Sequence, residues 1–94
     1  MKQHITLKQW DELTKDQKNT LHDFDFINDW KMNIGQMIEF LGDDLDFIRR
    51  RKSPEGYIYF EVYFQKNNQS ATSRFSYDEL ADALWEAVKF KFKQ

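Results

Sequence analysis

The clearest hydrophobic pattern in the chain is a two-residue alternation over residues 57–64. One set of positions is apolar throughout, which is typical of a strand with one face against a core. The apolar set is Ile58, Phe60, Val62 and Phe64, and the other set is Tyr57, Tyr59, Glu61 and Tyr63. The pattern therefore predicts the central strand of a sheet.

Turn signals on both sides of this segment predict its neighbours. The stretch Ser53-Pro54-Glu55-Gly56 has proline at the second turn position and glycine at the fourth, so residues 46–52 should pair antiparallel with the central strand. A connection over residues 65–70, which includes two asparagines, should lead to a third strand over residues 71–75. The three strands would form an antiparallel meander.

The apolar period changes to three and four residues near the C-terminus, which predicts a helix over residues 77–92. The recurring positions are Leu80, Ala81, Leu84, Trp85, Ala87 and Val88. Lysines in the last turns suit the negative end of the helix dipole. We expect this helix to pack on the apolar face of the central strand.

Four helix starts share one capping signal, in which Ser, Thr or Asn is followed three positions later by Gln or Glu. The signals begin at Thr6, Thr14, Asn33 and Ser76. The first three predict helices over residues 7–13, 15–22 and 34–41. Gly42, which tolerates a left-handed cap conformation, should end the helix over 34–41.

This order of elements predicts the α+β class and a single domain over residues 1–94. Short N-terminal helices precede a three-stranded antiparallel meander, and a long C-terminal helix packs on the sheet. The pattern leaves open which face of the sheet the N-terminal helices cover. They would either cover the tyrosines or leave them exposed to a partner.

Composition narrows the class of protein. A chain of 94 residues with 40% hydrophobic and 17% aromatic residues suits one small folded domain. It has no cysteine, which argues against disulfides and thiol chemistry and fits a reducing compartment. No apolar stretch approaches the roughly 20 residues of a spanning helix or resembles a signal segment. We expect a protein of the host cell cytoplasm with no membrane association.

The net charge of -2 conceals an asymmetry between the two halves of the chain. Residues 1–48 hold five lysines and ten acids, whereas residues 49–94 hold nine basic residues and six acids. The overall charge provides no general attraction to polyanions. Binding to nucleic acid would have to be local.

Two segments resemble a group of small uncharacterised proteins encoded by phages and prophages of Firmicutes. The segments are Asn33-Ile34-Gly35-Gln36-Met37-Ile38-Glu39-Phe40-Leu41 and Glu79-Leu80-Ala81-Asp82-Ala83-Leu84-Trp85-Glu86-Ala87-Val88-Lys89. The resemblance covers about residues 33–90 and includes the intervening meander. It implies a mobile-element accessory protein, many of which bind and disable host machinery such as CRISPR and other defence systems.

Candidate catalytic residues are scarce, and we expect no enzyme activity, cofactor or metal. Only His4 and His22 could serve as imidazole bases, and neither lies in a catalytic motif. The acids Asp23, Asp25 and Asp29, and the acids Asp43, Asp44 and Asp46, lack the spacing of a calcium-binding loop. They are better interpreted as solvated turn residues. The three glycines are isolated, so there is no phosphate-binding loop.

The tyrosine face of the sheet is the main candidate site. Tyrosine and arginine are enriched among the residues that dominate protein interfaces. The partner-binding residues we predict are Tyr57, Tyr59, Tyr63, Arg49, Arg51 and Arg74. The alternative is that the N-terminal helices cover this face and the hydroxyl groups meet water at its rim.

The run of four cations before the turn is a second candidate. Strand alternation must place Arg49 and Arg51 on one face and Arg50 and Lys52 on the other. The cations therefore do not form one stripe, although Arg50 and Lys52 are candidates for nucleic-acid contact. The run could otherwise guard an edge strand or contact an acidic protein.

These observations favour a non-enzymatic binding protein that inhibits or modulates a host protein or nucleoprotein complex. A CRISPR or other defence effector is the target that the resemblance implies. The alternative is a nucleic-acid-binding accessory protein that uses the basic and aromatic patch. Either a monomer or a homodimer is compatible with the sequence.

Overall fold

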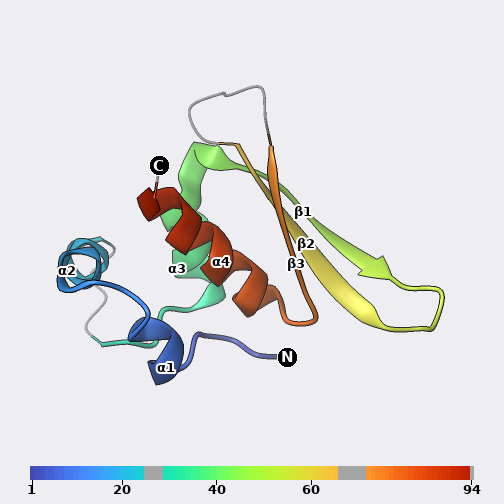
Figure 1. Ribbon diagram of the computed structural model, residues 1–94, viewed down its shortest axis with the longest axis horizontal. Helices are drawn as coiled ribbons and strands as arrows, with labels where there is room; N and C mark the ends of the chain where they lie inside the picture. Colours follow the sequence, from blue (N-terminus) through green and yellow to red (C-terminus); the bar gives the residue numbers. More distant parts are fainter. Residues whose placement is uncertain (25–28, 66–71, 94) are drawn as a thin grey trace.

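The fold is built on a three-stranded antiparallel sheet with helices on one side. The computed structural model describes residues 1–24, 29–65 and 72–93. The strands lie in the order β1 (Leu45–Lys52), β2 (Ile58–Phe64) and β3 (Ser73–Tyr77) (Figure 1). The helices are α1 (Leu7–Trp10), α2 (Lys15–Asp23), α3 (Ile34–Leu41), the 3-10 turn η1 (Gly42–Asp44) and α4 (Leu80–Lys93). The predicted α+β class is confirmed.

The turn between β1 and β2 closes as its sequence predicts. The backbone N–H of Ser53 donates to the carbonyl of Tyr57 at 2.8 Å, and that of Gly56 donates to the carbonyl of Ser53 at 2.9 Å. Gly56 has a φ of 94°, which a residue with a Cβ rarely adopts. Pairing outward from this closure places Arg51 opposite Tyr59 and Arg49 opposite Glu61.

An irregularity in β1 reverses the faces that its side chains occupy. Leu45 pairs with Phe64 and Phe47 pairs with Tyr63, so Asp46 is an extra residue in the ladder. Without it, Leu45 would lie on the same face as Phe47 and the two alternate arginines that follow. The register from the turn places Phe47 and these arginines on the face opposite the helices, and the bulge brings Leu45 to the core face.

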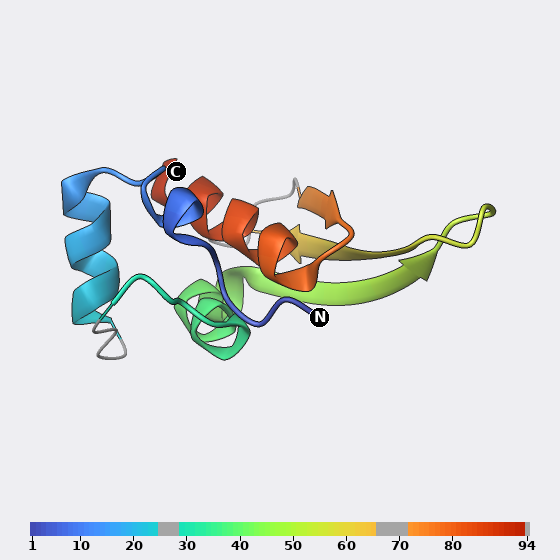
Figure 2. The same cartoon turned by 90° about the horizontal axis from the view of Figure 1, so that it is seen from below.

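The apolar face of the sheet is covered by α4, as the sequence predicted, and α3 lies beside α4 (Figure 2). Val62 and Phe64 of β2 are fully or almost fully buried. The ring of Phe90 from α4 meets those of Phe64 and Phe75 edge-on, with both centroid distances at 5.6 Å. Trp85 and Leu84 are fully buried in the same core.

The start of α4 differs from the prediction. The helix begins at Leu80 and ends at Lys93, rather than spanning residues 77–92. Ser76 and Tyr77, assigned to the helix start, instead pair with Glu61 and Phe60 and extend β3 to Tyr77. The strand ladder uses their backbone groups, so the helix starts later. The connection expected over residues 65–70 lies outside the described residues except for Gln65.

Three of the four predicted capping signals form complete capping boxes, at Thr6, Thr14 and Asn33. The bounds of α3 agree with the prediction, and Gly42 ends it with a φ of 56°. The first helix is shorter than the predicted 7–13 and ends at Trp10. Leu13, which follows the end of this helix, is nevertheless buried.

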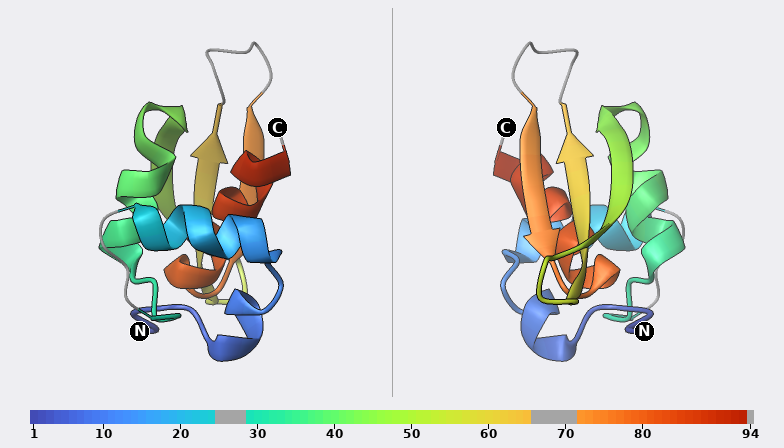
Figure 3. Two further views of the ribbon diagram at one scale, coloured as in Figure 1. Left: turned by 90° about the vertical axis from the view of Figure 1, so that its left-hand side faces the viewer. Right: turned by 90° about the vertical axis from the view of Figure 1, so that its right-hand side faces the viewer.

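The N-terminal helices lie on the side of α3 and α4 that is remote from the sheet (Figure 3). Aromatic contacts hold them there: the ring of Phe24 lies edge-on to that of Phe40 in α3, with a centroid distance of 5.4 Å. Trp10 and Leu21 are buried. Because this layer packs on helices, neither N-terminal helix covers the tyrosine face.

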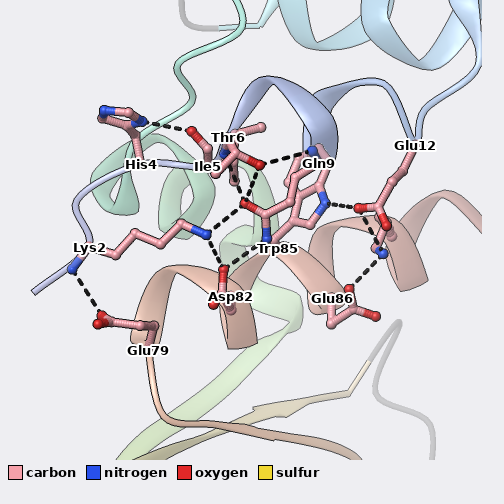
Figure 4. Close-up of polar contacts among 11 residues, drawn as sticks. Lys2, His4, Ile5, Thr6, Gln9, Glu12, Glu79, Asp82, Trp85 and Glu86 are labelled. Atoms are coloured by element: carbon pink, nitrogen blue, oxygen red, sulfur yellow. Dashed lines mark hydrogen bonds and ion pairs between the residues drawn. The ribbon is translucent and has the colours of Figure 1, made fainter.

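Polar contacts attach the N-terminal segment to α4 (Figure 4). Lys2 donates its backbone N–H to Glu79 at 2.9 Å and pairs through its ammonium group with Asp82. Gln9 also donates to Asp82, at 2.8 Å. Farther along α4, the indole N–H of Trp85 donates to Glu12 Oε1 at 2.9 Å.

Candidate binding face

The face of the sheet opposite α3 and α4 combines basic and aromatic side chains. Strand pairing and alternation place eight residues on it, and we call this set the open sheet face. Its members are Phe47, Arg49, Arg51, Tyr59, Glu61, Tyr63, Arg74 and Ser76. Three positive charges and one negative charge give the set a net charge of +2.

Glu61 lies at the centre of the open sheet face and is only 3% exposed, although no helix covers it. Three guanidinium groups surround its carboxylate. Oε1 lies 3.5 Å from Nε of Arg49 and 3.9 Å from a terminal nitrogen of Arg51, and Oε2 lies 3.3 Å from a terminal nitrogen of Arg74. One acid on the central strand therefore gathers arginines from both edge strands.

The ion pairs leave one oxygen of the Glu61 carboxylate without a hydrogen bond in the described part of the chain. Among the described residues, Oε1 of Glu61 has no hydrogen-bond partner even though it is buried. The side chains of Arg49, Arg51 and Arg74 remain 47%, 45% and 60% exposed. The arginines are thus held near one carboxylate while much of each guanidinium group stays open to solvent.

The aromatic part of the face is a stacked pair at the bulged end of β1. The rings of Phe47 and Tyr63 are nearly parallel, at 17°, with centroids 4.2 Å apart. The guanidinium carbon of Arg49 lies 5.8 Å from both centroids. Phe47 is 44% exposed, so the pair presents an apolar edge to solvent.

Arg49 connects the aromatic pair to the carboxylate. It donates a hydrogen bond to the hydroxyl of Tyr63 at 3.3 Å while its Nε faces Glu61. The hydrogen bond to Tyr63, with the nearby negative charge of Glu61, raises the pKa of Arg49 above its usual value. These contacts orient the guanidinium group, which carries its positive charge at any physiological pH.

Five of the six predicted partner-binding residues meet on the open sheet face: Tyr59, Tyr63, Arg49, Arg51 and Arg74. Tyr57 lies at the turn end of the hairpin, immediately before β2, and is 71% exposed. Arg50 and Lys52 pair with Phe60 and Ile58, so they occupy the other face of β1. They are therefore separated from the arginines around Glu61.

Sequence reasoning missed two residues of the site, Glu61 and Phe47. A charge in the middle of a central strand was a signal, and pairing outward from the turn would have placed Arg49 opposite it. The same pairing would have placed Phe47 opposite Tyr63, because the extra residue Asp46 lies beyond Phe47 and changes only the register of Leu45.

The histidines are engaged in local contacts. Nδ1 of His4 lies 2.7 Å from the carbonyl of Ile5, and the ring of His22 lies edge-on to Trp10 at 5.2 Å. Within residues 1–24, 29–65 and 72–93, no group of three or more His, Cys, Asp or Glu side chains is placed to hold a metal ion. Asp25, from one of the two acidic groups, lies outside the described residues.

The described part of the chain forms no detectable pocket. None of its helices has both the length and the apolar character needed to cross a bilayer. Comparisons with protein-family models, curated proteins and solved structures found no match.

Proposed function

We propose that this chain is a non-enzymatic binding protein that uses the open sheet face to contact another protein. The observation that supports this most directly is the gathering of Arg49, Arg51 and Arg74 around the buried carboxylate of Glu61. Exposed arginines held in place beside aromatic rings are typical of residues that dominate protein interfaces.

The resemblance to phage and prophage proteins favours an accessory role in which the partner belongs to a host complex. A CRISPR effector or another defence protein is the target class it implies. The surface chemistry is compatible with such a role, since arginine and tyrosine add contact area and directional hydrogen bonds. The identity of the target rests on the resemblance alone.

Affinity capture from a host lysate tests this function. We expect the wild-type chain to recover a partner that the double variant Arg51→Ala, Tyr59→Ala loses. Arg50→Ala is the matched control, because it removes a neighbouring arginine from the opposite face of the same strand. Recovery of the same partner by the wild type and the double variant would reject the open sheet face as the binding surface.

The second candidate is binding to nucleic acid, which the guanidinium groups beside aromatic rings favour. Two features weigh against it. The stacking of Phe47 on Tyr63 occupies one face of each ring, which leaves less area for bases. Glu61 also places a negative charge at the centre of the path that phosphates would follow. Titration with single- and double-stranded DNA and RNA over a salt series distinguishes the two candidate functions. Steeply salt-dependent micromolar binding would favour nucleic acid as the ligand.

A further inference from the structure

The three arginines on the open sheet face retain hydrogen-bond donors that internal contacts do not use. Arg49 donates to the Tyr63 hydroxyl, but neither Arg51 nor Arg74 donates a hydrogen bond to any other described residue. A guanidinium group has five N–H donors in a planar arrangement that suits a carboxylate. These donors remain available to a partner.

The charge of the face sets how many anionic groups it can neutralise. Glu61 compensates one of the three arginines, so two positive charges remain. Two carboxylates would balance the face, whereas a longer run of negative charge would meet Glu61 at its centre. A partner with separated acids and uncharged backbone between them is therefore complementary.

The positions of the arginines set the spacing of those acids. Arg49 and Arg51 lie on β1, and Arg74 lies on β3, two strands away across β2 and level with Phe47. All three side chains lean toward Glu61, so their guanidinium groups lie closer together than this offset along the strands would place them. Two interstrand steps span about 10 Å. An extended polyproline II segment rises roughly 3.1 Å per residue with three residues per turn, so its residues i and i+3 lie on one side about 9 Å apart.

We propose that the open sheet face binds an extended acidic protein segment that crosses the strands and presents two carboxylates three residues apart. One carboxylate pairs with Arg49 and Arg51, and the other pairs with Arg74. The exposed edge of Phe47 and Tyr63 contacts an apolar side chain of the same segment. This inference rests on the proposed function and specifies the chemistry of the partner.

The test is an NMR titration of the isotope-labelled chain with short capped peptides. The acidic probe is a proline-rich peptide with two glutamates three residues apart, and its control has glutamines at the same positions. A short oligothymidylate is the third probe. We expect only the acidic peptide to shift the amides of β1 and β3 and the Nε–H signals of the three arginines.

Charge-removing variants then locate the contact. Arg51→Gln and Arg74→Gln should each weaken binding of the acidic peptide by about fivefold, in the range of a single solvent-exposed charge pair. Arg50→Gln, on the opposite face of β1, should leave the dissociation constant within about twofold. An amide spectrum of each variant shows whether the fold is retained.

Four results would overturn the inference: no binding of the acidic peptide, equal binding of the glutamine peptide, tighter binding of the oligothymidylate, or an equal loss of affinity in Arg50→Gln and Arg51→Gln. If the Arg51→Ala, Tyr59→Ala variant still loses its captured partner, the proposed function stands and only the acidic chemistry is wrong. Recovery of the same partner would instead reject the proposed function.

Discussion

Arg49 lies directly opposite Glu61 in the antiparallel ladder, with its Nε 3.5 Å from Oε1 of the carboxylate. Cross-strand pairs of opposite charge stabilise a sheet modestly when both groups are exposed. Here the acid is buried while the arginine is half-exposed. The pair therefore joins a desolvated carboxylate to a guanidinium group that can still contact a partner, which links stability of the sheet to binding.

Replacing the central acid should destabilise the fold. We expect Glu61→Gln to lower the free energy of unfolding by about 1 kcal/mol, because three arginines would remain close together without a counter-ion. Urea unfolding at low and high salt measures this, and salt should reduce the loss by screening the arginines. Glu55→Gln, at the exposed hairpin turn, is the control. An equal loss in the free energy of unfolding for both variants would show that the ion pairs around Glu61 do not stabilise the sheet.

The same substitution should strengthen binding of the acidic peptide. Glu61→Gln raises the charge of the open sheet face from +2 to +3 and frees the guanidinium groups from an internal competitor. We expect an affinity gain on the order of threefold at low salt, which shrinks as salt is added. Weaker binding would mean that Glu61 chiefly positions the arginines.

The stacked aromatic pair should contribute separately to stability. Phe47→Ala removes the ring that stacks on Tyr63. It should lower the free energy of unfolding by about 1 kcal/mol, within the range for aromatic pairs and partly buried rings. Tyr57→Ala provides a matched aromatic control, since Tyr57 is 71% exposed and should cost less than roughly 0.5 kcal/mol. Thermal and urea unfolding compare the two. Equal costs would argue that the stack is energetically unimportant.

Much of this architecture follows from local rules in the sequence. Alternation over β2 and the Pro54-Gly56 turn correctly predict which tyrosines share a face and where the hairpin closes. Three capping signals form as predicted because a cap depends on residues within one turn. The capping signal at Ser76 does not start a helix there, because pairing with β2 extends β3 through Ser76 to Tyr77.

The central features of the site depend on longer-range geometry. The bulge at Asp46 brings Leu45 to the core face, and no turn signal marks it. The burial of Glu61 depends on arginines from both edge strands. The location of α2 depends on packing between helices, so alternation in the sheet could not show that the tyrosine face is open.

Backbone conformation at the end of α3 gives a test with a close internal control. Gly42 has a φ of 56°, and no described atom lies within 4 Å of the position that a Cβ would occupy, so Gly42→Ala would be penalised by conformation rather than by contact. We expect a loss of about 1–2 kcal/mol in the free energy of unfolding. Gly35→Ala, inside α3, should not lower stability, because alanine favours a helix. Similar losses at both positions would show that conformation at Gly42 is not limiting.

The contact between Glu12 and Trp85 makes a pH-dependent contribution to stability. Burial alone would raise the pKa of Glu12, but hydrogen bonds from Trp85 and Lys89 and the charge of Lys89 outweigh it, so the pKa lies below its ordinary value of 4.5. The unfolded chain therefore binds this proton at a higher pH than the folded chain. The resulting stabilisation is complete above pH 4.5 and is lost as the pH falls through the folded-state pKa.

Glu12→Gln isolates this charge, because glutamine keeps an oxygen that can accept the indole N–H of Trp85. We expect the variant to be less stable than the wild type at neutral pH and the difference to shrink as the pH is lowered below 4.5. Urea unfolding of both proteins across this range measures the difference, with Glu55→Gln as the control for removal of an exposed acid. A difference that stays constant with pH would mean that the lost stability comes from packing or hydrogen-bond geometry at Trp85, because only the ionised carboxylate provides a contribution that protonation removes.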